Sequence, residues 1–202
     1  ALNYSITAIG TMILQSAVNI FGSSVVASFT AAMKVEQLST QPMPTLGTTM
    51  STYCGQNLGA GEYERIYDGM RKAFFISILL TILAALICVF GGGSMMKLFL
   101  SNPTAEVTSY ATRYLKTISV FFFFLSILFL YRTALQGLGK GIVPMIGGFL
   151  ELVGRVIIIY FFLDSWGYRA VCLASPAAWV LAGIPNMAAY LIWKNRTKKT
   201  PA

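Results

Sequence analysis

Two charged side chains, Glu151 and Arg155, stand four residues apart inside a long apolar run. On a helix this spacing places them one turn apart, with the acid on the favourable N-terminal side. A charge inside an apolar bundle is costly and rarely lacks a partner. The pair is therefore suited to a proton or cation relay or to a substrate counter-charge. The alternative is a static ion pair that locks neighbouring helices.

A second group of polar side chains forms a stripe along one helical segment. At 100° per residue its members fall within about 80° of one another. We interpret the stripe as one wall of a water-filled pathway, the alternative being hydrogen-bonded contacts between packed helices. Glu36 lies about 160° away, so it is not expected to pair with the lysine of the stripe. The stripe consists of Lys34, Gln37, Gln41, Thr45, Thr48 and Thr52.

A glycine-rich unit occurs twice, at residues 56–61 and 136–141. Neither copy has the Lys-Ser/Thr of a P-loop or the third glycine of a dinucleotide-binding turn. Each copy follows a segment of helical length, where glycine ends a helix in the left-handed conformation. We therefore predict helix-end motifs rather than phosphate sites, formed by Gln56, Asn57, Gly59, Gly61, Gln136, Gly137 and Gly139.

The composition places these residues in a membrane. Hydrophobic residues make up 56% of the chain, charged residues only 11%, and the mean hydropathy is +0.68, whereas a soluble domain is about 25% charged. The sequence has no histidine and only three, widely spaced cysteines, so no metal site is predicted. Without a convergent nucleophile and base, a membrane-embedded enzyme is also disfavoured. We expect no cofactor other than a coupling ion.

Charged residues and Gly/Pro-rich breaks divide the chain into six apolar segments of helical length. None alternates as a strand would, and no separate soluble domain fits between them. A membrane helix needs roughly 20 residues, so the fold class is an all-α polytopic membrane protein with a six-helix bundle. The predicted spans are residues 1–20, 24–57, 71–92, 110–136, 142–163 and 168–193.

The second segment is too long for one straight span. At about 1.5 Å per residue it would reach roughly 50 Å, against a hydrocarbon core of about 30 Å. Pro42 and Pro44 interrupt its hydrogen bonding and predict a kink. We interpret this kink as a hinge.

Lysine and arginine counts at the segment ends predict the orientation, because basic residues are retained in the cytoplasm. The predicted side that also carries the C-terminus holds nine lysine and arginine residues, and the opposite side holds four. Basic residues at the ends of apolar runs do not form the water-facing patch of a nucleic-acid-binding protein. The group of nine consists of Arg65, Arg71, Lys72, Arg132, Lys140, Lys194, Arg196, Lys198 and Lys199. The group of four consists of Lys97, Arg113, Lys116 and Arg169.

Several motifs in fixed order resemble the MATE family, the multidrug and toxic compound extrusion transporters. They are Phe29-Thr30-Ala31-Ala32-Met33-Lys34, Pro42, Ser51-Thr52, residues 55–61, residues 132–139, Pro144 and residues 151–155. The likeness covers essentially the whole chain and aligns it with the second six-helix lobe of a twelve-helix protein. The chain begins inside a helix, so the first lobe is expected to be a missing partner.

The resemblance implies a bacterial plasma-membrane antiporter that exchanges organic cations, drugs or other amphiphiles for inward H⁺ or Na⁺. Some branches of the family place a coupling acid in the first helix of this lobe, but residues 1–20 contain none. Glu36, Glu151 or an acid of the other lobe remain as candidates. The alternative function is a lipid-linked oligosaccharide flippase, whose pyrophosphate would meet Lys34 and Arg155.

Overall fold

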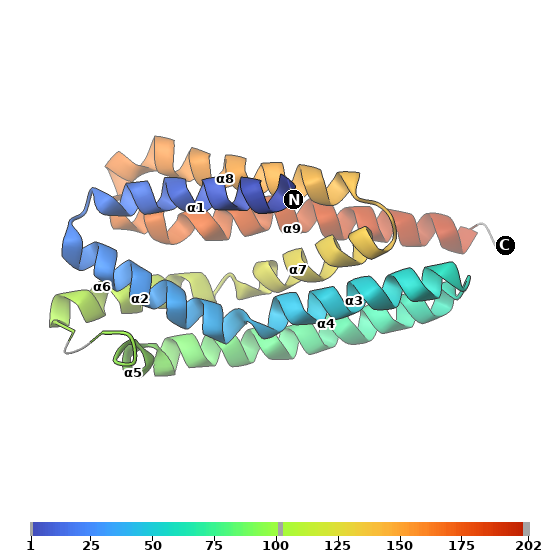
Figure 1. Cartoon of the computed structure of the whole chain (residues 1–202), viewed down its shortest axis with the longest axis horizontal. Helices are drawn as coiled ribbons and strands as arrows, with labels where there is room; N and C mark the ends of the chain where they lie inside the picture. The colour runs from blue at the N-terminus through green and yellow to red at the C-terminus, as the bar shows by residue number, and fades with distance from the viewer. Residues whose placement is uncertain (1, 101–102, 200–202) are drawn as a thin grey trace.

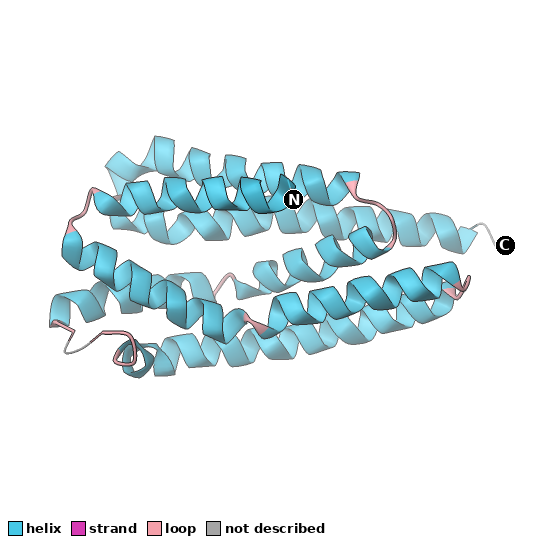
Figure 2. Ribbon diagram, in the orientation of Figure 1, coloured by secondary structure: helices cyan, strands magenta, loops and turns pink. Residues whose placement is uncertain are grey.

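The computed structural model describes residues 2–100 and 103–199, and every regular element in these ranges is helical (Figure 2). Ala1, where the first predicted span begins, lies outside them. The elements are α1 (Leu2–Asn19), α2 (Ser23–Thr40), α3 (Pro42–Gly59), α4 (Tyr63–Leu86), the π-helical turn η1 (Ile87–Gly91), α5 (Gly92–Met96), α6 (Ala105–Ser119), α7 (Phe122–Gly137), α8 (Ile142–Trp166) and α9 (Tyr168–Lys199).

The helices run up and down along one long axis (Figure 1). α1, α8 and α9 pack together, and α2–α3 lie beside α4, while α7 contacts both α3 and α9 and joins the two groups. The α3–α4 turn, the α7–α8 loop and the C-terminal end of α9 lie at one end of the bundle. The α1–α2 and α8–α9 turns lie at the other.

The long second segment is divided between α2 and α3 at Gln41. The Gln41 N–H still donates to the Gln37 carbonyl at 3.0 Å. Pro42 is the first residue of α3, where a missing N–H is tolerated and the fixed φ favours helix. The prolines therefore end one helix and begin the next.

Two helices begin earlier than the sequence analysis placed them. α4 starts at Tyr63 rather than residue 71. Its first two turns contain polar and charged residues, which the sequence analysis had placed outside the helix. α6 starts at Ala105 rather than residue 110, and the side chain of Thr104 caps it by accepting from the Val107 N–H at 3.3 Å. Charge had been interpreted as a break, but here it marks exposed helix ends.

A bend between α6 and α7 was not predicted. The two helices meet at 54° near Val120 and Phe121, where the sequence has neither Gly nor Pro. The predicted span of residues 110–136 is therefore two helices, and α7 leans into the middle of the bundle (Figure 1).

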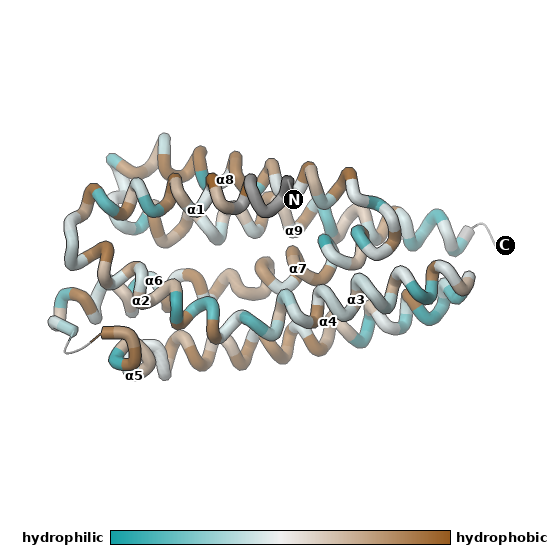
Figure 3. Tube along the Cα trace, in the orientation of Figure 1, coloured by the Kyte–Doolittle hydropathy of each residue, from teal (hydrophilic) through white to brown (hydrophobic). Residues whose placement is uncertain are grey.

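Three helical stretches among the described residues are long and apolar enough to cross a membrane. They are Tyr63–Met96, Ile142–Trp166 and Tyr168–Lys198, and the bent α6–α7 pair makes a fourth. α1 and α2–α3 are not among them. Figure 3 shows hydrophilic residues in the half of α2 next to α3 and toward the end of the bundle that holds the C-terminus.

The glycine-rich units end α3 and α7 in the same manner, but the left-handed glycine is the sixth residue of the first unit and the fourth residue of the second. Gly61 has φ +73° and Gly139 has φ +71°. The next N–H in each copy closes a wide turn, from Glu62 to the Asn57 carbonyl and from Lys140 to the Leu135 carbonyl. Gly59 and Gly137 are the last helical residues and are not left-handed.

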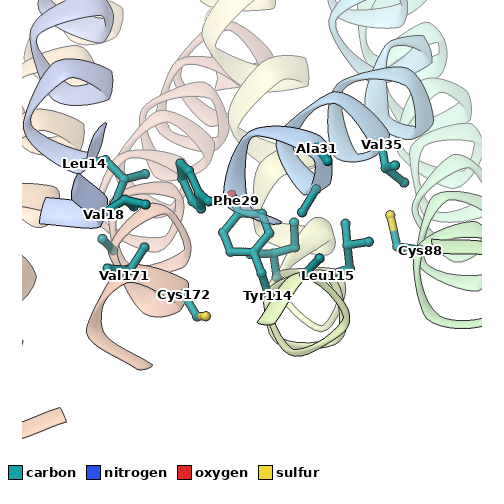
Figure 4. Packing of buried hydrophobic residues seen from close by; sticks show 14 of the residues in the cluster. Leu14, Val18, Phe29, Ala31, Val35, Cys88, Tyr114, Leu115, Val171 and Cys172 are labelled. Atoms are coloured by element: carbon teal, nitrogen blue, oxygen red, sulfur yellow. The ribbon is translucent and has the colours of Figure 1, made fainter. Parts of the chain in front are cut away.

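Buried aromatic and aliphatic side chains hold α1, α2, α6 and α9 together (Figure 4). The rings of Phe29 on α2 and Tyr114 on α6 meet edge to face, with centroids 5.0 Å apart. Both residues are almost completely buried. This packing fixes the position of the Tyr114 hydroxyl, which belongs to the site described next.

Candidate functional site

A cavity of about 440 Å³ lies where α1, α2–α3, α6, α7, α8 and α9 converge. Its wall on α2–α3 follows one helix face, whose positions recur every three or four residues. Gln136, which is exposed and one residue before the end of α7, also lines the cavity. The cavity therefore reaches the end of the bundle that holds the C-terminus. The α2–α3 wall consists of Met33, Glu36, Gln37, Thr40, Pro44 and Thr48.

Three charged side chains form a buried cluster at this cavity. Arg155 Nη2 donates to Glu151 Oε1 at 3.0 Å, and Arg132 Nη2 donates to Glu151 Oε2 at 2.5 Å. The side chains of Glu151 and Arg155 are 6% and 7% exposed, and that of Arg132 is 12% exposed. The predicted pair is thus a cluster of one acid and two guanidiniums.

The guanidinium of Arg155 is held tightly against α1. A Cβ on Gly10 would lie 2.6 Å from Arg155 Nη1 and 3.2 Å from Arg155 Cδ, so a side chain at position 10 would displace the guanidinium. The backbone of α1 therefore covers one side of the arginine.

The second acid of the cavity, Glu36, has a different partner. The Tyr114 hydroxyl donates to Glu36 Oε2 at 2.8 Å. No ion pair joins Glu36 to an arginine or lysine within 4.0 Å among the described residues. The cavity thus contains one carboxylate bound by two cations and one bound by a neutral phenol.

Only part of the predicted polar stripe reaches the cavity. Gln37 and Thr48 line it, whereas Lys34 and Gln41 do not. Lys34 is exposed, and its Nζ lies 5.5 Å from the centre of the Phe99 ring. Glu36, which was expected to face away from the stripe, lines the cavity beside Gln37, because the cavity face of α2 is rotated from the stripe. Of the prolines, Pro44 lines the cavity and Pro42 does not.

The sequence analysis missed Arg132 as a site residue. It was counted with the basic residues at the segment ends, although it lies inside α7 and binds Glu151 across to α8. The available signal was a charge inside the predicted span of residues 110–136, but pairing between two helices leaves no periodicity that would have identified Glu151 as its partner.

The predicted helix-end residues take separate roles. Asn57 Nδ2 donates to the Tyr53 carbonyl at 2.8 Å, and Gln56 is exposed. Gly137 packs so closely on α3 that a Cβ would overlap the Ser51 carbonyl. Only Gln136 of this set lines the cavity.

The chemistry of the cavity is that of charge recognition. Among residues 2–100 and 103–199 no three His, Cys, Asp or Glu side chains cluster as metal ligands. The guanidiniums can donate hydrogen bonds, and Glu36 can exchange a proton or attract a cation. Such groups bind and release charged species.

Comparison with known sequences gives a consistent result. Residues 1–161 match the MatE family. The chain is 28% identical over 171 residues to the probable multidrug resistance protein YpnP of Bacillus subtilis, covering 85% of this chain and 35% of that protein. It is 26% identical over 164 residues to the probable multidrug resistance protein NorM of Thermotoga maritima, covering 78% of this chain and 35% of that protein. The chain thus spans about a third of these relatives.

Solved structures show the same fold. The chain matches a MOP superfamily transporter from Pyrococcus furiosus, described as having a binding pocket of reverse polarity, with a TM-score of 0.88 and 22% identity. It covers 98% of this chain and 45% of that one. An inward-facing MATE multidrug resistance transporter matches with a TM-score of 0.85 and 19% identity, over 100% of this chain and 47% of that one.

The family match extends over most of the chain, and the helical arrangement matches about half of each solved transporter. This all-α integral membrane protein therefore belongs to the MatE family of transporters, and it spans about half of a MATE structure.

Proposed function

We propose that this chain is the second six-helix lobe of a secondary active antiporter. The transporter exports organic cations, drugs or other amphiphiles across a bacterial plasma membrane in exchange for H⁺ or Na⁺. The observation that carries the proposal is the cavity itself, in which the Glu36 carboxylate accepts from a neutral phenol and forms no ion pair within 4.0 Å in the part of the chain that the structure describes. A carboxylate in such a setting can gain and lose a cation without breaking an ion pair.

The surface of α2–α3 supports the need for another lobe. Lys34, Gln41 and Thr45 are exposed on this chain, and polar side chains at membrane depth are stable only against protein or water. The other half of the transporter would cover this face or share a water-filled pathway with it. Lys34 and Gln41 then belong to the contact between lobes rather than to the cavity.

The bend at Gln41 is the proposed hinge. Pro42 is exposed at the bend and Pro44 lies at the cavity wall, so rotation of α3 relative to α2 would change access to the cavity. Broken helices serve transporters in this way. Replacing Pro42, which does not line the cavity, with alanine should slow transport while leaving substrate binding intact.

The test uses the protein expressed from its native gene with all flanking sequence, reconstituted in vesicles. An imposed inward H⁺ or Na⁺ gradient should drive export of amphiphilic dyes, measured by fluorescence. In Glu36→Gln the dyes should still bind but lose their gradient-driven movement. Absence of gradient-driven movement for every dye in the wild type would rule out the proposal.

Glu106→Gln is the matched control. Glu106 is an exposed acid on α6, the helix that carries Tyr114, and it does not line the cavity. Its replacement should leave gradient-driven transport unchanged, so a shared loss in both variants would point to damage of α6 rather than to coupling.

A lipid-linked oligosaccharide flippase is the second candidate, and the two arginines of the cavity favour it. A pyrophosphate is recognised by guanidinium groups. Such a protein would move a pyrophosphate lipid between the leaflets of a vesicle and would not transport soluble dyes.

A further inference from the structure

We propose that this cavity binds the anionic group of its ligand, a carboxylate, sulfonate or phosphate, through Arg155 and Arg132. The inference rests on the proposed transport function and specifies the charge of the substrate. Of the substrates named in the proposed function, the inference favours anionic amphiphiles over organic cations.

The hydrogen-bond inventory of the cluster supports this choice. Each guanidinium has five N–H donors, and Glu151 accepts from one nitrogen of each arginine. Arg155 Nε and Nη1 and Arg132 Nε are buried, and none has a hydrogen-bond partner in the part of the chain that the structure describes. Buried polar groups are ordinarily paired, and an unpaired one costs about 1–3 kcal/mol. The cluster therefore has more donors than acceptors, and a ligand oxygen would satisfy them once the guanidiniums turn toward the cavity that both arginines line.

The balance of charges in the cluster is a second argument for an anionic ligand. The two guanidiniums share one carboxylate, which leaves one positive charge in a largely buried cluster. A buried charge without its counter-charge is strongly disfavoured. Glu36 lines the same cavity, is hydrogen-bonded by Tyr114 rather than by either arginine, and interacts electrostatically with Arg155 when it is ionised. An anion entering the cavity would supply the counter-charge when Glu36 is protonated.

The shape of the site suits an amphiphile. Leu125, Leu128, Phe129 and Trp179 line the same cavity as the arginines, so an apolar body can lie against them while its acid meets the guanidiniums. Arginine binds carboxylates and phosphates through two parallel N–H donors, and both arginines line this cavity.

The test compares two dyes with the same ring system and opposite charge, carboxyfluorescein and rhodamine 123. Binding to the full protein in nanodiscs is measured by fluorescence anisotropy at low ionic strength. We expect carboxyfluorescein to bind at least about tenfold more tightly. We expect Arg155→Gln to remove about tenfold of that affinity, the effect of one charge-assisted hydrogen-bond partner. Rhodamine binding should not weaken in this variant.

Arg155→Gln is a suitable variant because Glu151 keeps Arg132 as its partner. The control is Arg113→Gln, an exposed arginine on α6 outside the cavity, which should leave both affinities unchanged. If Arg155→Gln does not yield folded protein, Glu36→Gln replaces it. That variant removes the competing carboxylate and should tighten carboxyfluorescein binding.

Rhodamine 123 binding as tightly as carboxyfluorescein to the wild type would overturn the inference. So would carboxyfluorescein affinity that is unaffected by Arg155→Gln or is not raised by Glu36→Gln. Farnesyl pyrophosphate is added as a competitor to separate sources of the anion: strong displacement indicates a pyrophosphate lipid, and weak displacement a soluble organic anion. Gradient-driven export of rhodamine without carboxyfluorescein binding would retain the transporter and reject only the anionic ligand.

Discussion

Glu151 is the residue on which the charged cluster depends. It is the shared acceptor for Arg132 on α7 and Arg155 on α8, and all three side chains are largely buried. The sequence predicted the pair within α8 because four-residue spacing is a local signal. It could not predict Arg132, because a contact between two helices depends on how they pack.

Replacing Glu151 with glutamine should therefore be the most destabilising single change in the cluster. It leaves two buried guanidiniums without a counter-charge, and breaking a buried pair costs about 3–5 kcal/mol. Arg155→Gln should cost less than half as much, since Arg132 still neutralises Glu151. The double variant Glu151→Gln/Arg155→Gln should recover little, because Arg132 stays unpaired. Thermal unfolding of the purified variants in detergent measures the loss of stability in each and so ranks them.

Asp68→Asn provides the control for this comparison. Asp68 also binds two cations, with Lys72 Nζ at 2.6 Å and Arg71 Nη2 at 3.2 Å, but its side chain is 45% exposed. Exposed ion pairs contribute about 0–1 kcal/mol. An equal loss of stability in Asp68→Asn and Glu151→Gln would contradict the role assigned to burial.

At the scale of elements, α3 and α7 approach each other through glycine. A Cβ on Gly137 would overlap the backbone of Ser51, and a Cβ on Gly47 would lie 3.0 Å from the Phe129 carbonyl oxygen. The Thr133 hydroxyl donates to the Gly47 carbonyl at 2.7 Å across the same contact. This close approach sets the position of α7 and hence of Arg132.

Gly137→Ala should destabilise the protein by about 3 kcal/mol or more, because a methyl group would press on backbone atoms that cannot rotate away. Gly59→Ala is the matched control. It is also the last residue of a helix, but a Cβ there would meet nothing within 4 Å. The yield of monodisperse protein and the melting temperature should fall for Gly137→Ala alone. Equal behaviour of the two variants would refute the tight α3–α7 contact.

The breaks between helices differ in how they are marked in the sequence. Pro42 and Pro44 lie where α3 follows α2, because proline has a local effect on the backbone. The bend at Val120 and Phe121 has no such marker in the sequence, so it depends on tertiary packing of α6 and α7. The cavity face of α2 was likewise beyond prediction, since helical periodicity says which residues share a face but not what that face meets.

At the scale of the whole molecule, the two ends of the bundle differ in charge. Basic residues are concentrated at the α3–α4 turn, the α7–α8 loop and the end of α9, which lie at one end of the bundle (Figure 1). Because Arg132 lines the cavity instead, this end has one basic residue fewer than the sequence analysis counted. It still has more basic residues than the opposite end. The members described here are Arg65, Arg71, Lys72, Lys140, Lys194, Arg196 and Lys198.

This asymmetry predicts that the α3–α4 turn lies in the cytoplasm, because basic residues resist translocation. Cysteine labelling tests it with little background, since Cys54, Cys88 and Cys172 are buried. Ala60→Cys, at the exposed α3–α4 turn, should react with a membrane-impermeant maleimide in inverted vesicles but not in intact cells. Ser165→Cys, exposed near the opposite end of the bundle, should show the reverse. Labelling of Ala60→Cys from outside intact cells, with Ser165→Cys protected, would invert the topology and place the mouth of the cavity at Gln136 outside the cell.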